Sequence, residues 1–174
     1  MRIILTCLFV ISYIINSWAQ LGGCTGPGLP SCQCGTATVL CDIQQLNGVT
    51  YQMSTYQHPA DGPTPMCPGV TNTSSQNPTW YAFPAWCSNL TLQITYTNCS
   101  GSGTSRGLQA AVYANCNNLP GSVVPGGCAT DWSCVPPPCY GCGVTNGQRI
   151  LNMTGLTVGA TYYLLVDGCG GSAC

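Results

Sequence analysis

Cysteine is the feature that most constrains this chain, because 15 of its 174 residues are cysteines. Cys7 lies in an apolar leader, and the remaining fourteen, an even number, follow it. This density is typical of extracellular domains whose small cores are reinforced by covalent bonds. We therefore expect up to seven disulfides, formed among Cys24, Cys32, Cys34, Cys41, Cys67, Cys87, Cys99, Cys116, Cys128, Cys134, Cys139, Cys142, Cys169 and Cys174.

The order of the cysteines does not fix their pairing. Some short-range pairs would each close a small loop containing glycine or proline: Cys128–Cys134, Cys139–Cys142 and Cys169–Cys174. The alternative is metal or redox chemistry at the close pairs of residues 32–34 and 139–142. A thioredoxin-type motif opens a helix, whereas residues 139–142 follow three prolines. Structural disulfides are the favoured interpretation, with no metal site and no cofactor.

The first nineteen residues have the pattern of a secretory signal peptide. Arg2 precedes an apolar run over residues 3–15, and small residues stand at Ser17 and Ala19. A membrane span needs about 20 apolar residues, and this run has about thirteen. We expect cleavage after Ala19 and a secreted or cell-surface protein without membrane insertion. The domain organisation is then a signal peptide at 1–19, a Gly/Pro/Cys-rich segment at 20–35 and one domain at 36–174.

Four Asn-x-Ser/Thr sequons support export. They begin at Asn72, Asn89, Asn98 and Asn152, and we expect covalent N-glycans there. In residues 89–97 the apolar side chains alternate with polar ones, which places Asn89 on the polar face. The alternative is that these are plain polar residues of loops and strands.

Short alternating segments predict the fold class. They are rich in Thr, Val, Ile and Tyr and are separated by turn-forming residues. No window of ten or more residues shows helical periodicity without a glycine or proline. We expect an all-β, disulfide-rich antiparallel β-sandwich, jelly-roll-like, with little or no helix. The expected strands are 36–43, 48–53, 79–83, 89–98, 107–114, 148–156 and 161–167, joined by loops at 54–78 and 115–147. Residues 162–166 are apolar on both faces, which predicts a central strand or one covered by a partner.

The order of these segments also resembles a known family. The most specific part is the closing Gly-Ala-Thr-Tyr-Tyr-Leu-Leu-Val-Asp-Gly of residues 159–168. It resembles jelly-roll-type β-sandwich modules of large secreted bacterial surface proteins, of the gliding-motility-associated type, which are similar to bacterial pre-peptidase C-terminal domains. The resemblance spans about residues 37–174 and implies a non-catalytic extracellular module for adhesion, assembly or attachment. In such modules one more strand usually follows where this chain stops.

Charge excludes several functions. Only 4% of residues are charged, with no Lys and no Glu, so clustered cations for nucleic acid are missing. The single histidine, His58, lies near Asp61 in a loop, without a Gly-x-Ser-x-Gly nucleophile motif. The four Asp show no pairing suited to a glycosidase and no calcium-loop spacing. We therefore do not expect an enzyme.

Aromatic residues are the remaining candidates for ligand binding. Trp80, Trp86 and Trp132 would contact carbohydrate if they formed a sugar-stacking face. Packing in the core or against disulfides is the favoured alternative for them. The two expected functions are a structural or adhesive subunit of an extracellular filament or matrix, and a carbohydrate-binding or accessory module of a larger secreted enzyme.

Low charge also favours self-association, because little repulsion keeps copies apart. A sandwich that lacks its last strand would expose an open edge for a neighbour's extended segment. The alternative is that the protein continues past Cys174 and that its final strand is not part of this sequence. Residues 20–35 are long enough to reach a neighbour, and Cys24, Cys32 or Cys34 would lock the joint. We expect a homopolymer formed by exchange of a strand or of this N-terminal segment.

Overall fold

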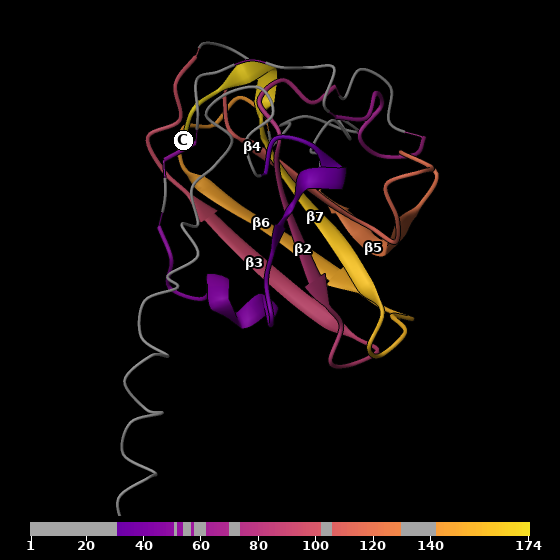
Figure 1. Cartoon of the computed structure of the whole chain (residues 1–174). Coiled ribbons are helices and arrows are strands. Elements are labelled where there is room, and N and C mark those ends of the chain that lie inside the picture. Colours follow the sequence, from indigo (N-terminus) through magenta and orange to yellow (C-terminus); the bar gives the residue numbers. More distant parts are fainter. Residues whose placement is uncertain are drawn as a thin grey trace, which may run out of the picture.

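The computed structural model describes residues 31–50, 52–53, 57, 62–69, 74–101, 106–129 and 142–174. These residues form seven strands in two sheets and three short 3-10 helices (Figure 1). Within these ranges there is no α-helix, which confirms the predicted disulfide-rich all-β class. No helix of the described residues is long and apolar enough to cross a membrane.

The larger sheet has the strand order β1-β2-β7-β4-β5. β1 runs parallel to β2, and every other pair in this sheet is antiparallel. β7 lies in the middle of this sheet, and its residues 164–168 are buried on both faces, as the apolar run at 162–166 predicts. The strands are β1 (Thr38–Val39), β2 (Thr79–Pro84), β4 (Leu108–Tyr113), β5 (Val123–Ala129) and β7 (Thr161–Gly168).

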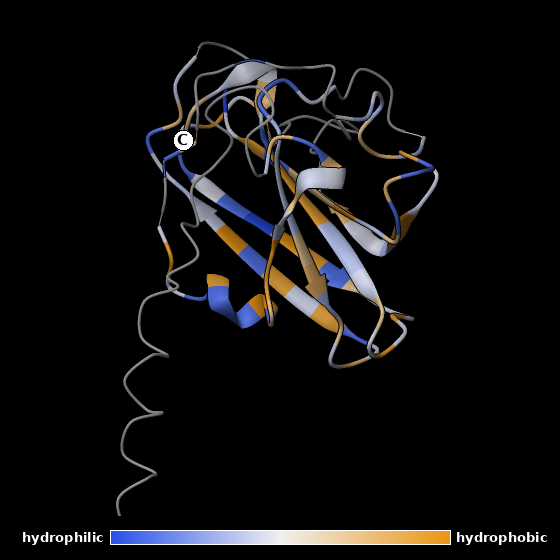
Figure 2. Cartoon of the chain, in the orientation of Figure 1, coloured by the Kyte–Doolittle hydropathy of each residue, from blue (hydrophilic) through white to orange (hydrophobic). Residues whose placement is uncertain are grey.

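The smaller sheet consists of β3 (Leu90–Tyr96) and β6 (Gly147–Met153), paired antiparallel. Its side chains alternate between the two faces, and Figure 2 shows apolar and polar positions following one another along β3. Leu151 and Met153 of β6 join inward side chains of β2, β4 and β7 in one core cluster. The two sheets therefore pack face to face.

A second core cluster covers the outer face of the larger sheet. Trp80 of β2 and Tyr113 of β4 lie with ring centroids 5.5 Å apart, and both are buried. The Tyr113 hydroxyl donates to the Met66 carbonyl at 2.7 Å, which holds the 62–69 segment against this face. The 3-10 helix η2 (Cys34–Thr36) packs here too, while η3 (Ile43–Leu46) and η5 (Cys169–Gly171) lie elsewhere.

Four disulfides join described residues: Cys34–Cys116, Cys67–Cys128, Cys99–Cys174 and Cys142–Cys169. Three of them span 61 to 82 residues of sequence. The three short-range pairs expected from the sequence are therefore wrong, because strand pairing brings together cysteines that are far apart in the chain. Cys32 is also disulfide-bonded, whereas Cys41 and Cys87 are free, against the expectation that all fourteen are paired.

Two strand predictions differ from the structure. Residues 36–43 form a strand only at β1, because Asp42 then caps η3: its carboxylate accepts from the Gln44 N–H at 2.9 Å. Of residues 48–53, those that the structure describes form no strand. β5 was missed, because its Pro125 and its two glycines are typical of a loop.

Candidate binding groove

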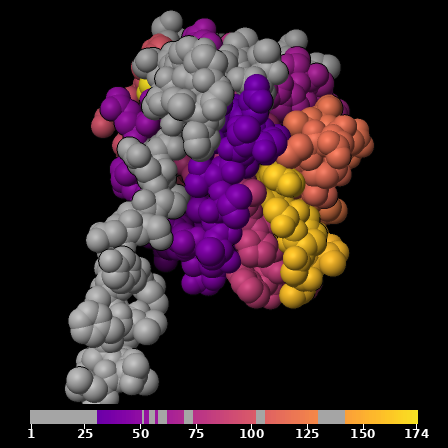
Figure 3. Space-filling view, in the orientation of Figure 1, coloured from indigo at the N-terminus to yellow at the C-terminus, as the bar shows by residue number. Residues whose placement is uncertain are grey.

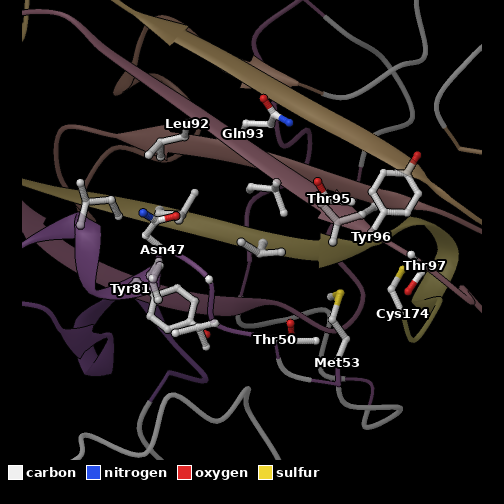
Figure 4. Close-up of a pocket in the computed structure, with 18 of the residues that line it drawn as sticks. Asn47, Thr50, Met53, Tyr81, Leu92, Gln93, Thr95, Tyr96, Thr97 and Cys174 are labelled. Atoms are coloured by element: carbon white, nitrogen blue, oxygen red, sulfur yellow. The ribbon is translucent and has the colours of Figure 1, made fainter.

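A groove of about 980 Å³ runs along β3. One wall is β3 with the two residues that follow it, so that the nine residues 90–98 line the groove. The opposite wall is η3 with the chain that follows it, including Asn47, Thr50 and Met53. Figure 4 shows these three residues across from Leu92 of β3. Nine residues of extended chain span about 30 Å, so the groove has the length of a whole strand.

The floor of the groove is the inner face of the larger sheet. It is formed by Tyr81, Leu108, Leu164 and Val166, all of which are nearly buried. These apolar residues come from β2, β4 and β7, and they belong to the core cluster shared by the two sheets. The groove is therefore bounded by the core on this side.

The groove exists because β3 is an edge strand. Within the described residues β3 pairs with β6 alone, and no strand pairs with its other edge. Its inward side chains Leu90, Leu92 and Ile94 are consequently only half-buried, although they pack against the core. An edge strand of this kind presents unpaired backbone N–H and C=O groups to a further strand.

One end of the groove is held by the chain's last residues. Cys174 is bonded to Cys99, directly after β3, and its carbonyl accepts from the Met53 N–H at 3.0 Å. The Ser100 N–H donates to the Ala173 carbonyl at 2.8 Å, so the two chain segments run against each other. This end is therefore fixed both covalently and by hydrogen bonds.

The side chains that line the groove carry no charge among the described residues. Among its described residues there is no Asp, Glu, His, Lys or Arg, and the polar groups are amides and hydroxyls such as Asn47, Thr50 and Gln93. The ionisable side chains are the phenols of Tyr81 and Tyr96. General acid–base catalysis needs a positioned proton donor or acceptor with a pKa near the working pH. This arrangement is suited to binding an uncharged chain that presents both apolar and polar groups.

Among the described tryptophans, Trp80 and Trp86 do not share a surface. Trp80 is fully buried against Tyr113, in agreement with the favoured alternative of core packing. Trp86 is 64% exposed, and Cys87 beside it is free. Trp132 lies outside the described residues.

The sequon asparagines that the structure describes are all exposed: Asn89, Asn98 and Asn152. Asn89 precedes β3 on the face predicted by the alternation. Asn152 lies across from Thr91 in the β3–β6 pair, and the Thr91 hydroxyl donates to its side-chain oxygen at 3.0 Å. Asn72 lies outside the described residues, as do His58 and Asp61.

A buried carboxylate on β7 was not predicted from the sequence. Asp167 is fully buried, and its Oδ1 accepts from the backbone N–H groups of Gln76 and Asn77, each at 2.8 Å. Its Oδ2 accepts from Gln109 Nε2 at 2.6 Å. Burial raises the pKa of the Asp167 carboxyl to about 7, although these three hydrogen bonds act to lower it. Its neighbour Val166 lines the groove, so Asp167 projects from the opposite face.

In the described part of the chain, no group of three or more His, Cys, Asp or Glu is placed to hold a metal ion. Comparison of the chain with family models, with curated proteins and with solved structures finds no match. The groove is therefore interpreted from its own geometry.

Proposed function

We propose that this protein is a secreted, N-glycosylated and disulfide-stapled structural or adhesive subunit that self-associates into an extracellular filament or matrix. In this proposal the groove along β3 accepts an extended segment of a second copy. The observation that carries the proposal is the unpaired edge of β3, which lies beside an apolar and uncharged floor over the length of a strand. Strand addition to such an edge supplies backbone hydrogen bonds, and the floor supplies apolar contact.

Copies of this protein have few surface charges that would repel one another. The described residues include four charged side chains, Asp42, Arg106, Arg149 and Asp167, and the last two are buried. Copies of a surface with so few charges repel one another weakly, and a net charge near zero promotes association. Glycans at the exposed asparagines would keep the remaining surface in solution.

The segment that enters the groove is shorter than residues 20–35, the donor expected from the sequence. Residues 31–35 belong to their own subunit: Ser31 is buried and accepts the Trp80 N–H at 2.8 Å, and Cys34 is bonded to Cys116. Cys34 therefore cannot serve as the expected joint. The proposed donor is residues 20–30, which contain no charged residue and extend over about 36 Å.

The test is a charge placed in the groove. Asn47→Asp keeps the side-chain shape and adds one negative charge to the neutral lining. We expect it to weaken self-association, measured by light scattering and electron microscopy of the purified protein. Asn117→Asp is the matched control, because Asn117 is exposed and lies outside the groove. Equal assembly of the two variants would contradict the proposal.

Deletion of residues 20–30 tests the donor separately. We expect the shortened chain to remain monomeric by itself. Mixed with the intact chain it should inhibit assembly, because its groove still binds a donor while it offers no donor to the next subunit. Assembly of the shortened chain at the normal concentration would show that another segment makes the contact.

A further inference from the structure

The two free thiols of the described chain are exposed. Of the eleven cysteines in the described ranges, nine are disulfide-bonded and only Cys41 and Cys87 are free. In an oxidising compartment, exposed thiols tend to be converted to disulfides. Because the other described cysteines are disulfide-bonded, these two exposed thiols are the described ones that remain available to an external partner.

Both thiols lie at the same end of the larger sheet. β1 and β2 run parallel, with Val39 paired to Ala82, so the turn after β1 and the connection after β2 leave the sheet at one end. Cys41 lies in the first of these segments and Cys87 in the second. In Figure 1 the turn between β1 and η3 and the β2–β3 connection both lie at the lower end of the molecule.

Exposed apolar side chains surround this end. Val39 is 75% exposed, Trp86 64% and Val158 61%, the three highest values among the exposed large hydrophobic side chains. Val158 lies near Trp86, because the next residue, Gly159, donates its N–H to the carbonyl of Ala85 at 2.8 Å. Figure 3 shows the indigo atoms of residues 31–50 beside the magenta and yellow atoms of these connections. We call Val39, Cys41, Trp86, Cys87 and Val158 the thiol patch.

The local contacts direct the two thiols differently. Leu40 is buried in the core between the sheets, so its neighbours Val39 and Cys41 face outward. The Cys87 Sγ–H donates to the Asn89 carbonyl at 2.8 Å, within its own turn. Neither thiol is bonded to the other, and each is available to a separate molecule.

We infer that Cys41 and Cys87 form disulfides with the corresponding thiols of neighbouring copies, and that Val39, Trp86 and Val158 make the apolar contact around these bonds. The inference rests on the proposed self-association, for which it names the covalent joint. A second copy is the partner because it brings the same two thiols and the same nearly uncharged surface. Two thiols per chain are enough for each subunit to be bonded to two neighbours.

The chemistry needs a two-electron oxidant, for which we name a small-molecule disulfide such as oxidised glutathione. The thiolate of one copy attacks this disulfide, forms a mixed disulfide and releases one reduced small thiol. The thiolate of the second copy then attacks the protein sulfur of the mixed disulfide and releases the other. Two protein thiols become one intersubunit disulfide, and one small-molecule disulfide becomes two thiols that take up the two protons.

Isotope mixing tests the joint in the full chain. Unlabelled and ¹⁵N-labelled proteins are mixed, oxidised with glutathione and digested at acidic pH, where thiol exchange is slow. We expect peptides containing Cys41 or Cys87 to be linked in mixed-isotope pairs, and covalent multimers on non-reducing gels. The double variant Cys41→Ser/Cys87→Ser should lose these multimers and keep the wild-type melting temperature.

Three results would overturn the inference. Peptides that link Cys41 to Cys87 only within one isotope would show an internal disulfide instead. Alkylation of both thiols in the assembled protein would show that they remain free. In either case, non-covalent assembly of the double variant by light scattering would leave the proposed function standing. Absence of both multimers and assembly would overturn the inference and the proposed function together.

Discussion

The two sides of the sandwich differ in how the smaller sheet meets the larger one. On one side, β6 runs against β5: the Thr154 N–H, just after β6, donates to the Pro125 carbonyl at 3.2 Å. On the other side, β3 faces the groove and has no strand beside it in the described chain. The inward residues Leu151 and Met153 of β6 are at most 1% exposed, whereas Leu90, Leu92 and Ile94 of β3 are half-buried.

The two sides differ in how closely two backbones approach each other rather than in the hydrophobicity of their side chains. The closed side depends on Gly126, where an added Cβ would lie 1.9 Å from the Asn152 carbonyl oxygen. The open side also has apolar side chains, but no strand of the described residues covers them. The sandwich therefore has a closed side, where contact between β5 and β6 stabilises the fold, and an open side along β3, which is available for binding.

The disulfides provide the largest test of this comparison. Cys99–Cys174 holds one end of the groove, and Cys67–Cys128 is attached to β5 on the closed side, with separations of 75 and 61 residues. Replacing either pair by alanines should cost about 4 kcal/mol of unfolding free energy, because both loops are long. Only loss of the Cys99–Cys174 bond should also change self-association.

Denaturant unfolding and light scattering of the two double variants make the measurement. Equal loss of assembly in both variants would show that the groove has no special dependence on the bond at its end.

The pH dependence should separate stability from binding. The pKa of Asp167 is raised from its ordinary value of 3.8 to about 7, so folding favours its protonated form. Its stabilising contribution is complete below about pH 4 and is lost as the pH rises through about 7, with a total on the order of 4 kcal/mol. Self-association should show no such titration, because the described groove lining has no Asp, Glu or His.

Urea unfolding between about pH 4 and pH 8 measures this loss. Asp167→Asn cannot ionise and should flatten the profile. A wild-type stability that rises over the same interval would show that the three hydrogen bonds outweigh burial.

Gly126→Ala should force β5 and β6 apart on the closed side. Gly126 has a φ of +72°, and the added Cβ would collide with the Asn152 backbone, so we expect a loss of about 3 kcal/mol. Gly155→Ala is the matched control, because Gly155 has the same φ of +72° with no atom within 4 Å of an added Cβ. Its cost should be about 1 kcal/mol.

Thermal unfolding of these two variants isolates the close approach from the backbone strain. Equal melting temperatures would mean that β5 and β6 separate without cost.

The smallest expected effect is that of a glycan at the edge of the thiol patch. Asn89 is exposed two residues beyond Cys87 and accepts the hydrogen bond of its thiol through the main chain. A glycan there would crowd the patch, so Asn89→Gln should moderately raise the rate of covalent multimer formation in a glycosylating host. The rate is followed on non-reducing gels, and an unchanged rate would place the glycan away from the joint.

The sequence predicted those parts of the fold that depend on local alternation. The Leu and Thr residues of 89–98 predict the two faces of β3, and the continuous apolar run at 162–166 predicts a central strand. β5 was missed because Pro125 and Gly126 are tolerated at a sheet edge for reasons visible only in three dimensions: the proline needs no partner for a missing N–H, and the glycine admits another backbone.

The site was less predictable, because it depends on long-range pairing. Self-association through an open edge was expected, but the groove is formed where η3 stands apart from β3, and the sequence predicted a strand at 48–53 instead. The sequence likewise did not predict the free thiols, because Cys41 and Cys87 differ from the bonded cysteines only in what the topology places beside them. Three-dimensional neighbours, rather than local pattern, decide both features.

Amide hydrogen exchange of β3 tests the central claim most directly. The protein is labelled in D₂O once as dispersed monomer at low concentration and once as assembled material, and peptides covering Leu90–Tyr96 and Gly147–Met153 are compared by mass spectrometry. The account predicts that assembly slows exchange along β3, where the edge N–H groups acquire partners, and leaves β6 unchanged. Exchange along β3 that is equally fast in both states would contradict the claim that its open edge receives a neighbour's strand.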